Sequence, residues 1–261
     1  MKPEKILKQI SEILIKQGVS IADPGLLHGK MGIIIFFFHY ARYMGDATFE
    51  DHAMVLMDEI QEQVLKQPGM DYANGLAGIG SGIEYLSQNN FIEANTNEIL
   101  EDFDERLFDE TSLGNHTNAG LHTGLTGLGR YFLLRIAGRD ANDEHVGTLN
   151  NKMQLIRITD ILDRMFFSLK EEETEDVFRF LCDMNKTNLY PAKTLKLLNH
   201  FSQNNMLRSR QMKIEELFHE YYENFELDID MVPDLYGGLA GAGLYLLGNL
   251  DKQHKKWINL L

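Results

Sequence analysis

The chain has 261 residues, 44% hydrophobic and 25% charged, which is the composition of a globular protein able to bury a sizeable core. Its formal net charge of −14 disfavours binding to nucleic acid or to an anionic membrane surface, and its single cysteine, Cys182, excludes an internal disulfide framework. The longest apolar run, residues 33–38, is too short to span a bilayer, and the charged N-terminus differs from a signal sequence. We therefore expect a cytoplasmic protein with no membrane span.

Apolar residues recur at helical spacing along nearly the whole chain. No segment shows the sustained alternation of a strand, so the predicted fold class is all-α. The predicted helices span residues 4–17, 29–44, 48–66, 76–88, 96–108, 125–137, 149–169, 173–183, 191–204, 210–225 and 239–250.

A glycine phrase occurs four times, each time before an apolar helical run. Its copies are HGKMGI (28–33), NGLAGIG (74–80), TGLTGLG (123–129) and GGLAGAG (237–243). The first glycines of the G-x-x-G patterns, Gly29, Gly75, Gly124 and Gly238, are separated by 46, 49 and 114 residues. The first two intervals suit one helical hairpin per repeat, and the third suits two, so we expect a repeat near residues 150–200 that has lost its glycine phrase.

Glycine weakens a helix interior by about 1 kcal/mol relative to alanine, so its clustering at four helix starts requires a compensating reason. We favour crowding, because a glycine lets another part of the chain approach closely. Binding of an anion at the exposed N–H groups of a helix start is the alternative.

These phrases resemble the repeats of the lanthionine synthetase C-like family, the cyclases of lantibiotic maturation. The resemblance rests on LLHGKMGI (26–33), DYANGLAGIG (71–80), GLHTGLTGLG (120–129) and DLYGGLAGAGLYLL (234–247), and residues 140–230 match only as helices. It implies an α/α toroid, here a single domain over residues 1–261 that is short of the family's length by about two hairpins. The ring is then either closed or incomplete. It also implies a zinc ion, held by two cysteines and a histidine, that activates a substrate thiolate for addition to a dehydroamino acid.

The zinc residues that the resemblance implies lie in late phrases of the W-C-x-G and C-H-G type, and this chain has neither phrase. Cys182 lies in RFLCDMNK, away from any glycine phrase, and one thiol does not make a two-cysteine site. We therefore predict no metal site and no cofactor.

Three residues carry over as catalytic candidates. Asp71 matches the spacing of a family aspartate and is either an acid/base group or the N-cap of the following helix. His28 directly precedes its phrase glycine, and His122 lies one residue before the corresponding slot, which Thr123 occupies. Both are either general acids or structural histidines at the mouth of the barrel. Asp234 has the spacing of Asp71 but is interpreted mainly as a cap, and His116 as a loop residue.

The preferred function is a lanthionine synthetase C-like protein of ribosomal peptide maturation without zinc-dependent cyclase chemistry. Its partner would be a precursor peptide or a peptide-modifying enzyme. Three alternatives stay open: a thioether-forming cyclase that uses Asp and His without zinc, an unrelated α/α-barrel enzyme acting on carbohydrate, and a pure binding scaffold.

Overall fold

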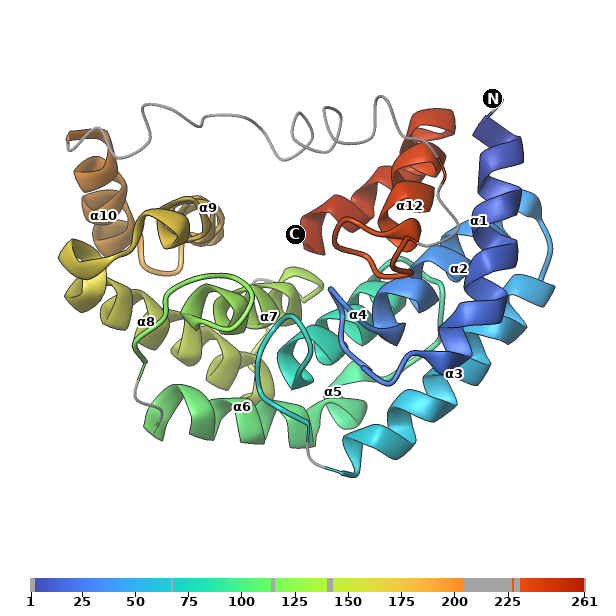
Figure 1. Ribbon diagram of the computed structural model, residues 1–261. Helices are drawn as coiled ribbons and strands as arrows, with labels where there is room; N and C mark the ends of the chain where they lie inside the picture. Colours follow the sequence, from blue (N-terminus) through green and yellow to red (C-terminus); the bar gives the residue numbers. More distant parts are fainter. Residues whose placement is uncertain are drawn as a thin grey trace. The chain divides into compact units, whose positions relative to one another are not determined.

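The computed structural model describes residues 3–66, 68–113, 116–139, 143–203, 227 and 231–260. In this part of the chain every regular element is a helix, so the all-α prediction is confirmed (Figure 1). The chain divides into two compact units, and each is described by itself. Unit 1 holds the described residues of Met1–Gly69 and Met212–Leu261, and unit 2 those of Met70–Gln211.

Unit 1 joins the beginning of the chain to its end. It contains α1 (Pro3–Gln17), α2 (Lys30–Met44), α3 (Thr48–Val64) and α12 (Leu239–Leu250), with 3₁₀ segments at Gly18–Ser20 and Lys252–Leu260. Helix α2 packs against α3 and α12, and α12 packs against α1 (Figure 1). Helix α2 is predominantly apolar and is buried from Lys30 to Ala41, as expected for an inner helix.

Unit 2 is a two-layered array of helical hairpins. It contains α4 (Leu76–Gln88), α5 (Thr96–Ile99), α6 (Glu101–Leu113), α7 (Leu125–Ala137), α8 (Val146–Met165), a 3₁₀ turn Phe166–Ser168, α9 (Glu171–Thr187) and α10 (Pro191–Gln203). Helices α4, α7 and α9 pack in series, and α6, α8 and α10 form a second series that covers them (Figure 1). This is the arrangement of inner and outer helices that the repeat predicts, within one unit.

The four glycine phrases adopt one local structure. Gly29, Gly75, Gly124 and Gly238 are each the N-cap of the helix that follows, and all are extended, with φ between −103° and −134° and ψ between −164° and −170°. At Gly29, Gly124 and Gly238 a Cβ would lie 2.4–2.6 Å from atoms of the preceding loop, mostly backbone. The loop folds back over the start of its own helix, and this is the close approach that requires glycine.

Backbone hydrogen bonds join the loops of neighbouring repeats in the same way in both units. In unit 2 the N–H groups of Tyr72 and Ala73 donate to the carbonyl of His122 at 3.1 and 2.9 Å. In unit 1 the N–H groups of Leu235 and Tyr236 donate to the carbonyl of Leu27 at 3.1 and 3.0 Å. The donors lie three and two residues before one phrase glycine, and the acceptor lies two residues before the other.

The last glycines of the second and fourth phrases hold neighbouring inner helices close together. A Cβ on Gly80 would lie 2.6 Å from the ring of Tyr131, and one on Gly243 would lie 2.3 Å from the ring of Phe36. Both rings lie seven residues after the phrase glycine of the neighbouring repeat. Each aromatic ring therefore packs directly on a glycine of the neighbouring helix, and a larger residue at that position would clash with the ring.

Helix α9 occupies the inner position of the repeat that lacks a glycine phrase. The ring of Phe180 packs on Gly129 of α7, as Tyr131 packs on Gly80, so α9 follows α7 in the same register. In the bonds described next, the loop before α7 donates to side chains of α9, where the other repeats use a loop carbonyl as the acceptor. Glu173 Oε1 accepts from the N–H of Ala119 at 3.0 Å, and Asp176 Oδ2 accepts from that of Leu121 at 2.8 Å. The prediction of a degenerate repeat between residues 150 and 200 matches this arrangement.

A buried ionic network ties α4, α6 and α7 together. Arg135, 2% exposed, donates to both oxygens of Asp104 at 3.2 and 2.7 Å and to Glu84 Oε2 at 2.7 Å. The hydroxyl of Tyr131 also donates to Asp104, at 2.6 Å, and burial raises the pKa of this tyrosine well above its ordinary value. The interior charges are thus paired and hydrogen-bonded, which a buried charge requires.

Most predicted helix bounds agree with the structure within a few residues. The predicted helix 96–108 is instead two helices, α5 and α6, separated at Leu100, and α6 continues to Leu113. The predicted helix 149–169 begins earlier, at Val146, and ends in a 3₁₀ turn. The predicted helix 210–225 lies outside the described residues. The assignment of residues 1–261 to one domain stays a prediction.

Candidate functional site

In unit 1 the first and last glycine phrases bring a histidine and an aspartate together. His28 Nδ1 lies 3.0 Å from Asp234 Oδ2, and the two residues are 206 positions apart in the sequence. The ring of Tyr236 stands edge-on to the imidazole, with centroids 5.9 Å apart. The side chain of His28 is 38% exposed whereas that of Asp234 is 11% exposed, so the histidine faces outward and the carboxylate lies behind it.

The environment of Asp234 favours a role in orienting His28. Burial raises the pKa of Asp234, and the hydrogen bond and the nearby charge of His28 act in the opposite direction. Oδ1 is buried against Gly238, whose backbone N–H also lowers this pKa although its geometry falls outside that of a standard hydrogen bond. A carboxylate behind one ring nitrogen fixes the tautomer of an imidazole and the orientation of its ring.

In unit 2, the loops that correspond to those of His28 and Asp234 line a cavity, and no histidine–aspartate pair is seen there among the described residues. Asp71 stands four residues before its phrase glycine, as Asp234 does, and Thr123 stands one residue before its glycine, as His28 does. Both line a cavity of about 310 Å³, together with Glu110, His116 and Asn118 among others. The Thr123 hydroxyl accepts from Asn118 Nδ2 at 2.8 Å. This cavity combines two carboxylates and an imidazole, so its chemistry is that of a hydrogen-bonding or acid/base site.

The structure separates the roles of the predicted pair Asp71 and His122. Asp71 Oδ1 accepts from the N–H of Asn74 at 2.8 Å, which closes the turn before α4. His122 contributes its carbonyl to the bonds from Tyr72 and Ala73, and the charge of its side chain acts on Asp176 of α9. The loops of the two candidates therefore meet. Asp71 lines the cavity, whereas the side chain of His122 lies outside its lining among the described residues.

Sequence reasoning missed the contributions of Glu110, His116 and Thr123 to this cavity. Glu110 lies beyond the predicted end of its helix at residue 108, and His116 was assigned to a loop with no role. The position of Thr123 could have indicated its role, because it directly precedes its phrase glycine, as His28 does. The catalytic roles of Asp71, His122 and His28 stay predictions.

The zinc site of the resembled family does not fit the described residues. Among them, no group of three or more histidine, cysteine or acidic side chains is placed to hold a metal ion. Cys182, on α9, is half-buried, and burial raises the pKa of its thiol, which disfavours the thiolate that a metal binds.

The fold and these sites define an all-α repeat protein with polar groups gathered where the loops meet the glycine-led helices. Neither a known protein-family model nor a curated protein matches this sequence. None of the helices in the described ranges combines the length and apolarity needed to cross a membrane.

Proposed function

We propose that this is a lanthionine synthetase C-like protein of ribosomal peptide maturation, with its inner helices arranged as an α/α toroid. The observation that carries the proposal is the bonding between loops. The second repeat donates to the third through Tyr72 and Ala73, and the last donates to the first through Leu235 and Tyr236. In the proposed toroid both sets of bonds run from a repeat to its successor, the first repeat being the successor of the last.

The proposed activity is binding of a peptide, or of the enzyme that modifies it, without zinc-dependent cyclisation. The chain has one cysteine, and its thiol is half-buried. The resembled reaction needs a thiolate, and a free thiol with a pKa near 8.5 is only a few per cent ionised at neutral pH. Without zinc ligands the main source of thiol activation in the resembled family is missing, which favours binding over cyclisation.

The His28–Asp234 pair favours one alternative, a metal-independent cyclase. His28 would take the proton of the substrate thiol, and the sulfur would add to the β-carbon of the dehydroamino acid as its C=C bond breaks. The imidazolium would then return the proton to the α-carbon, so atoms and charge balance without a further reactant. Asp234 would stabilise the imidazolium through the bond at 3.0 Å.

The two functions are distinguished with synthetic peptides that contain one cysteine and one dehydroalanine. Fluorescence anisotropy measures binding, and labelling of residual thiol with a maleimide, followed by mass spectrometry, measures cyclisation. We expect saturable binding with no faster loss of thiol than in buffer, and less than one zinc per chain by elemental analysis. Absence of binding to every such peptide would refute the proposal, and stoichiometric zinc would refute its metal-free part.

The His28→Gln variant tests the alternative, with His145→Asn as the matched control. His28 is partly exposed, and His145 lies at an exposed helix start where asparagine also caps. Loss of thiol that is accelerated by the wild type and by His145→Asn, but not by His28→Gln, would establish the cyclase. Equal rates in all three and in buffer would eliminate it.

A further inference from the structure

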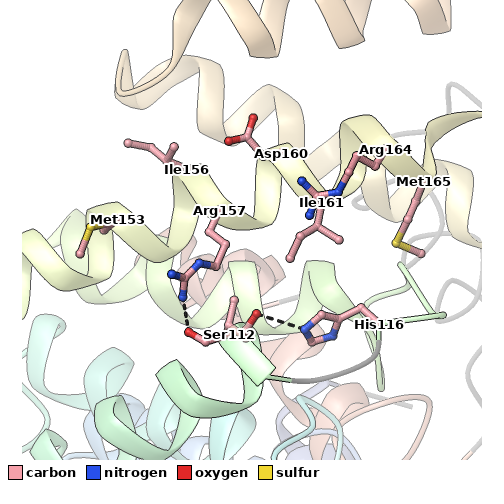
Figure 2. A pocket seen from close by; sticks show the side chains of 10 residues that line it. Ser112, His116, Met153, Ile156, Arg157, Asp160, Ile161, Arg164 and Met165 are labelled. Atoms are coloured by element: carbon pink, nitrogen blue, oxygen red, sulfur yellow. Dashed lines mark hydrogen bonds between the residues drawn. The ribbon is translucent and has the colours of Figure 1, made fainter.

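Unit 2 contains a second cavity, which none of the predicted site residues lines. It has a volume of about 600 Å³ and lies between the end of α6 and the second half of α8. Figure 2 shows Arg157 reaching from α8 to Ser112 on α6, with His116 beside it on the segment after α6. The volume is in the range of small-molecule sites.

Two arginines dominate the charge of this cavity. Arg157 and Arg164 are seven residues apart, so they lie two turns apart on one face of α8. Among the described residues neither guanidinium has a carboxylate within ion-pair distance. Arg157 donates instead to the neutral oxygens of Ser112 and, at 3.3 Å, Gln154. By contrast, a carboxylate partner is present at Arg106, Arg130, Arg135, Arg139 and Arg179.

The one carboxylate that lines the cavity is committed to other partners. Asp160 accepts from the hydroxyl of Tyr190 at 3.2 Å and pairs with Lys193 Nζ at 3.3 Å. In Figure 2 its carboxylate points away from Ser112, toward the opposite side of α8. Lys193 also pairs with Asp163 at 2.8 Å, and Lys196 pairs with Asp163 at 3.0 Å, so two lysines offset the charges of the two carboxylates. The two guanidinium charges are therefore not offset by Asp160.

The remaining lining suits a ligand with both an anionic and an apolar part. Ser112 has a hydroxyl, and the ring of His116 lies with Nε2 3.3 Å from the carbonyl of Thr111, which holds it at the cavity. Met153 and Met165 line opposite ends of the α8 segment, and their flexible thioethers adapt to an apolar group.

We propose that this cavity binds a small phosphate monoester, with the phosphate between Arg157 and Arg164 and the organic group against the methionines. A phosphate monoester carries close to two negative charges at neutral pH and three acceptor oxygens, so it can engage two guanidinium groups and a hydroxyl at once. A carboxylate carries one charge and two oxygens and satisfies fewer of these donors. The net charge of −14 opposes non-specific anion binding, so affinity must come from a local cationic site. This proposal is independent of the proposed peptide-related function.

The test uses phenyl phosphate, inorganic phosphate and benzoate as probes in isothermal titration at low salt with the full chain. We expect saturable binding of phenyl phosphate, tighter than that of inorganic phosphate and of benzoate. The Arg157→Gln/Arg164→Gln double variant should weaken phenyl phosphate binding by about tenfold or more, because it removes charge-assisted hydrogen bonds. Arg106→Gln/Arg179→Gln is the matched control, since it removes the same charge from arginines that have carboxylate partners.

Ser112→Ala is a second variant that leaves the net charge unchanged, and we expect it to weaken phenyl phosphate binding by a smaller factor. Circular dichroism melts verify that each variant is folded. Three results would overturn the proposal: no saturable binding of phenyl phosphate by the wild type, equal weakening by the two double variants, or benzoate binding as tightly as phenyl phosphate. The last result would assign the cavity to carboxylates.

Discussion

We expect a buried histidine pair to make unit 1 sensitive to acid. His39 on α2 and His254 in the C-terminal 3₁₀ segment face each other with their Nδ1 atoms 2.8 Å apart, and they are 2% and 0% exposed. One ring must donate and the other accept, so protonation of both imidazoles breaks this hydrogen bond. Burial, with the charges of His254 and Arg42, lowers the pKa of His39 from 6.5 to about 3.

The pKa of His254 is also lowered, by burial and by Arg42, while Asp251 acts in the opposite direction. Tyr43, whose ring lies 6.1 Å from that of His254, also faces the pair. Because the folded-state pKa of each histidine is depressed, the unfolded chain binds the proton first as the pH falls. Stability is therefore complete above the unfolded pKa of 6.5 and is lost progressively toward the folded pKa of about 3.

The magnitude for His39 follows from linkage. At about pH 5 an unfolded histidine of pKa 6.5 is almost fully protonated while His39 is still neutral, so this residue alone lowers the free energy of unfolding by about 2 kcal/mol relative to pH 7.5. His254 adds to this loss in the same direction. The assay is urea unfolding, followed by circular dichroism at several pH values between 7.5 and 5.

The His39→Asn variant keeps a polar group near the position of Nδ1 and removes the titration. We expect it to be less stable than the wild type at pH 7.5, yet to lose about 2 kcal/mol less between pH 7.5 and 5. His145→Asn, at an exposed histidine, should keep the wild-type slope. If His39→Asn and the wild type lose equal stability over this range, the assignment of the acid sensitivity to this pair is wrong.

Three further predictions concern unit 2. Arg135→Met leaves Asp104 buried without its cation and should lower the free energy of unfolding by about 3–5 kcal/mol in urea unfolding, and a loss under 1 kcal/mol would contradict the network. Gly124→Ala places a Cβ 2.6 Å from loop backbone and should destabilise by about 1–3 kcal/mol, whereas Gly147→Ala, with no contact closer than 3.3 Å, should be neutral or stabilising in the same thermal melts. Asp176→Ala orphans the N–H of a neighbouring loop and should cost about 1–3 kcal/mol, while Asp176→Asn keeps an acceptor and should cost less; equal losses would exclude the acceptor role.

Local sequence patterns predicted most helices and the repeat, because each depends on residues that lie only a few positions apart in the sequence. The spacing of apolar residues located most helices, and the glycine phrase located four N-caps. The end of α6 was misplaced because residues 109–112 are polar. In the structure Thr111 is buried, and its hydroxyl bonds back to the carbonyl of Leu107, which lets the helix continue.

The pairings that build the sites are non-local, and no local pattern encodes them. His28 meets Asp234 across 206 residues, and His39 meets His254 across 215. The sequence marked the first pair as candidates only through their places in the glycine phrases. It held no signal for the second pair, nor for the way in which Glu173 and Asp176 replace a missing loop.

Unit 1 is built from segments near both ends of the sequence, and this has a consequence for biosynthesis. Helices α1, α2 and α3 leave the ribosome first. The predominantly apolar α2 packs against both α3 and α12, and α12 is made last. Unit 2 is contiguous in sequence, and its described helices, α4 to α10, pack on one another and are complete by residue 203. We therefore expect the middle of the nascent chain to fold during translation, while its first sixty residues await the final stretch and depend on chaperones until translation ends.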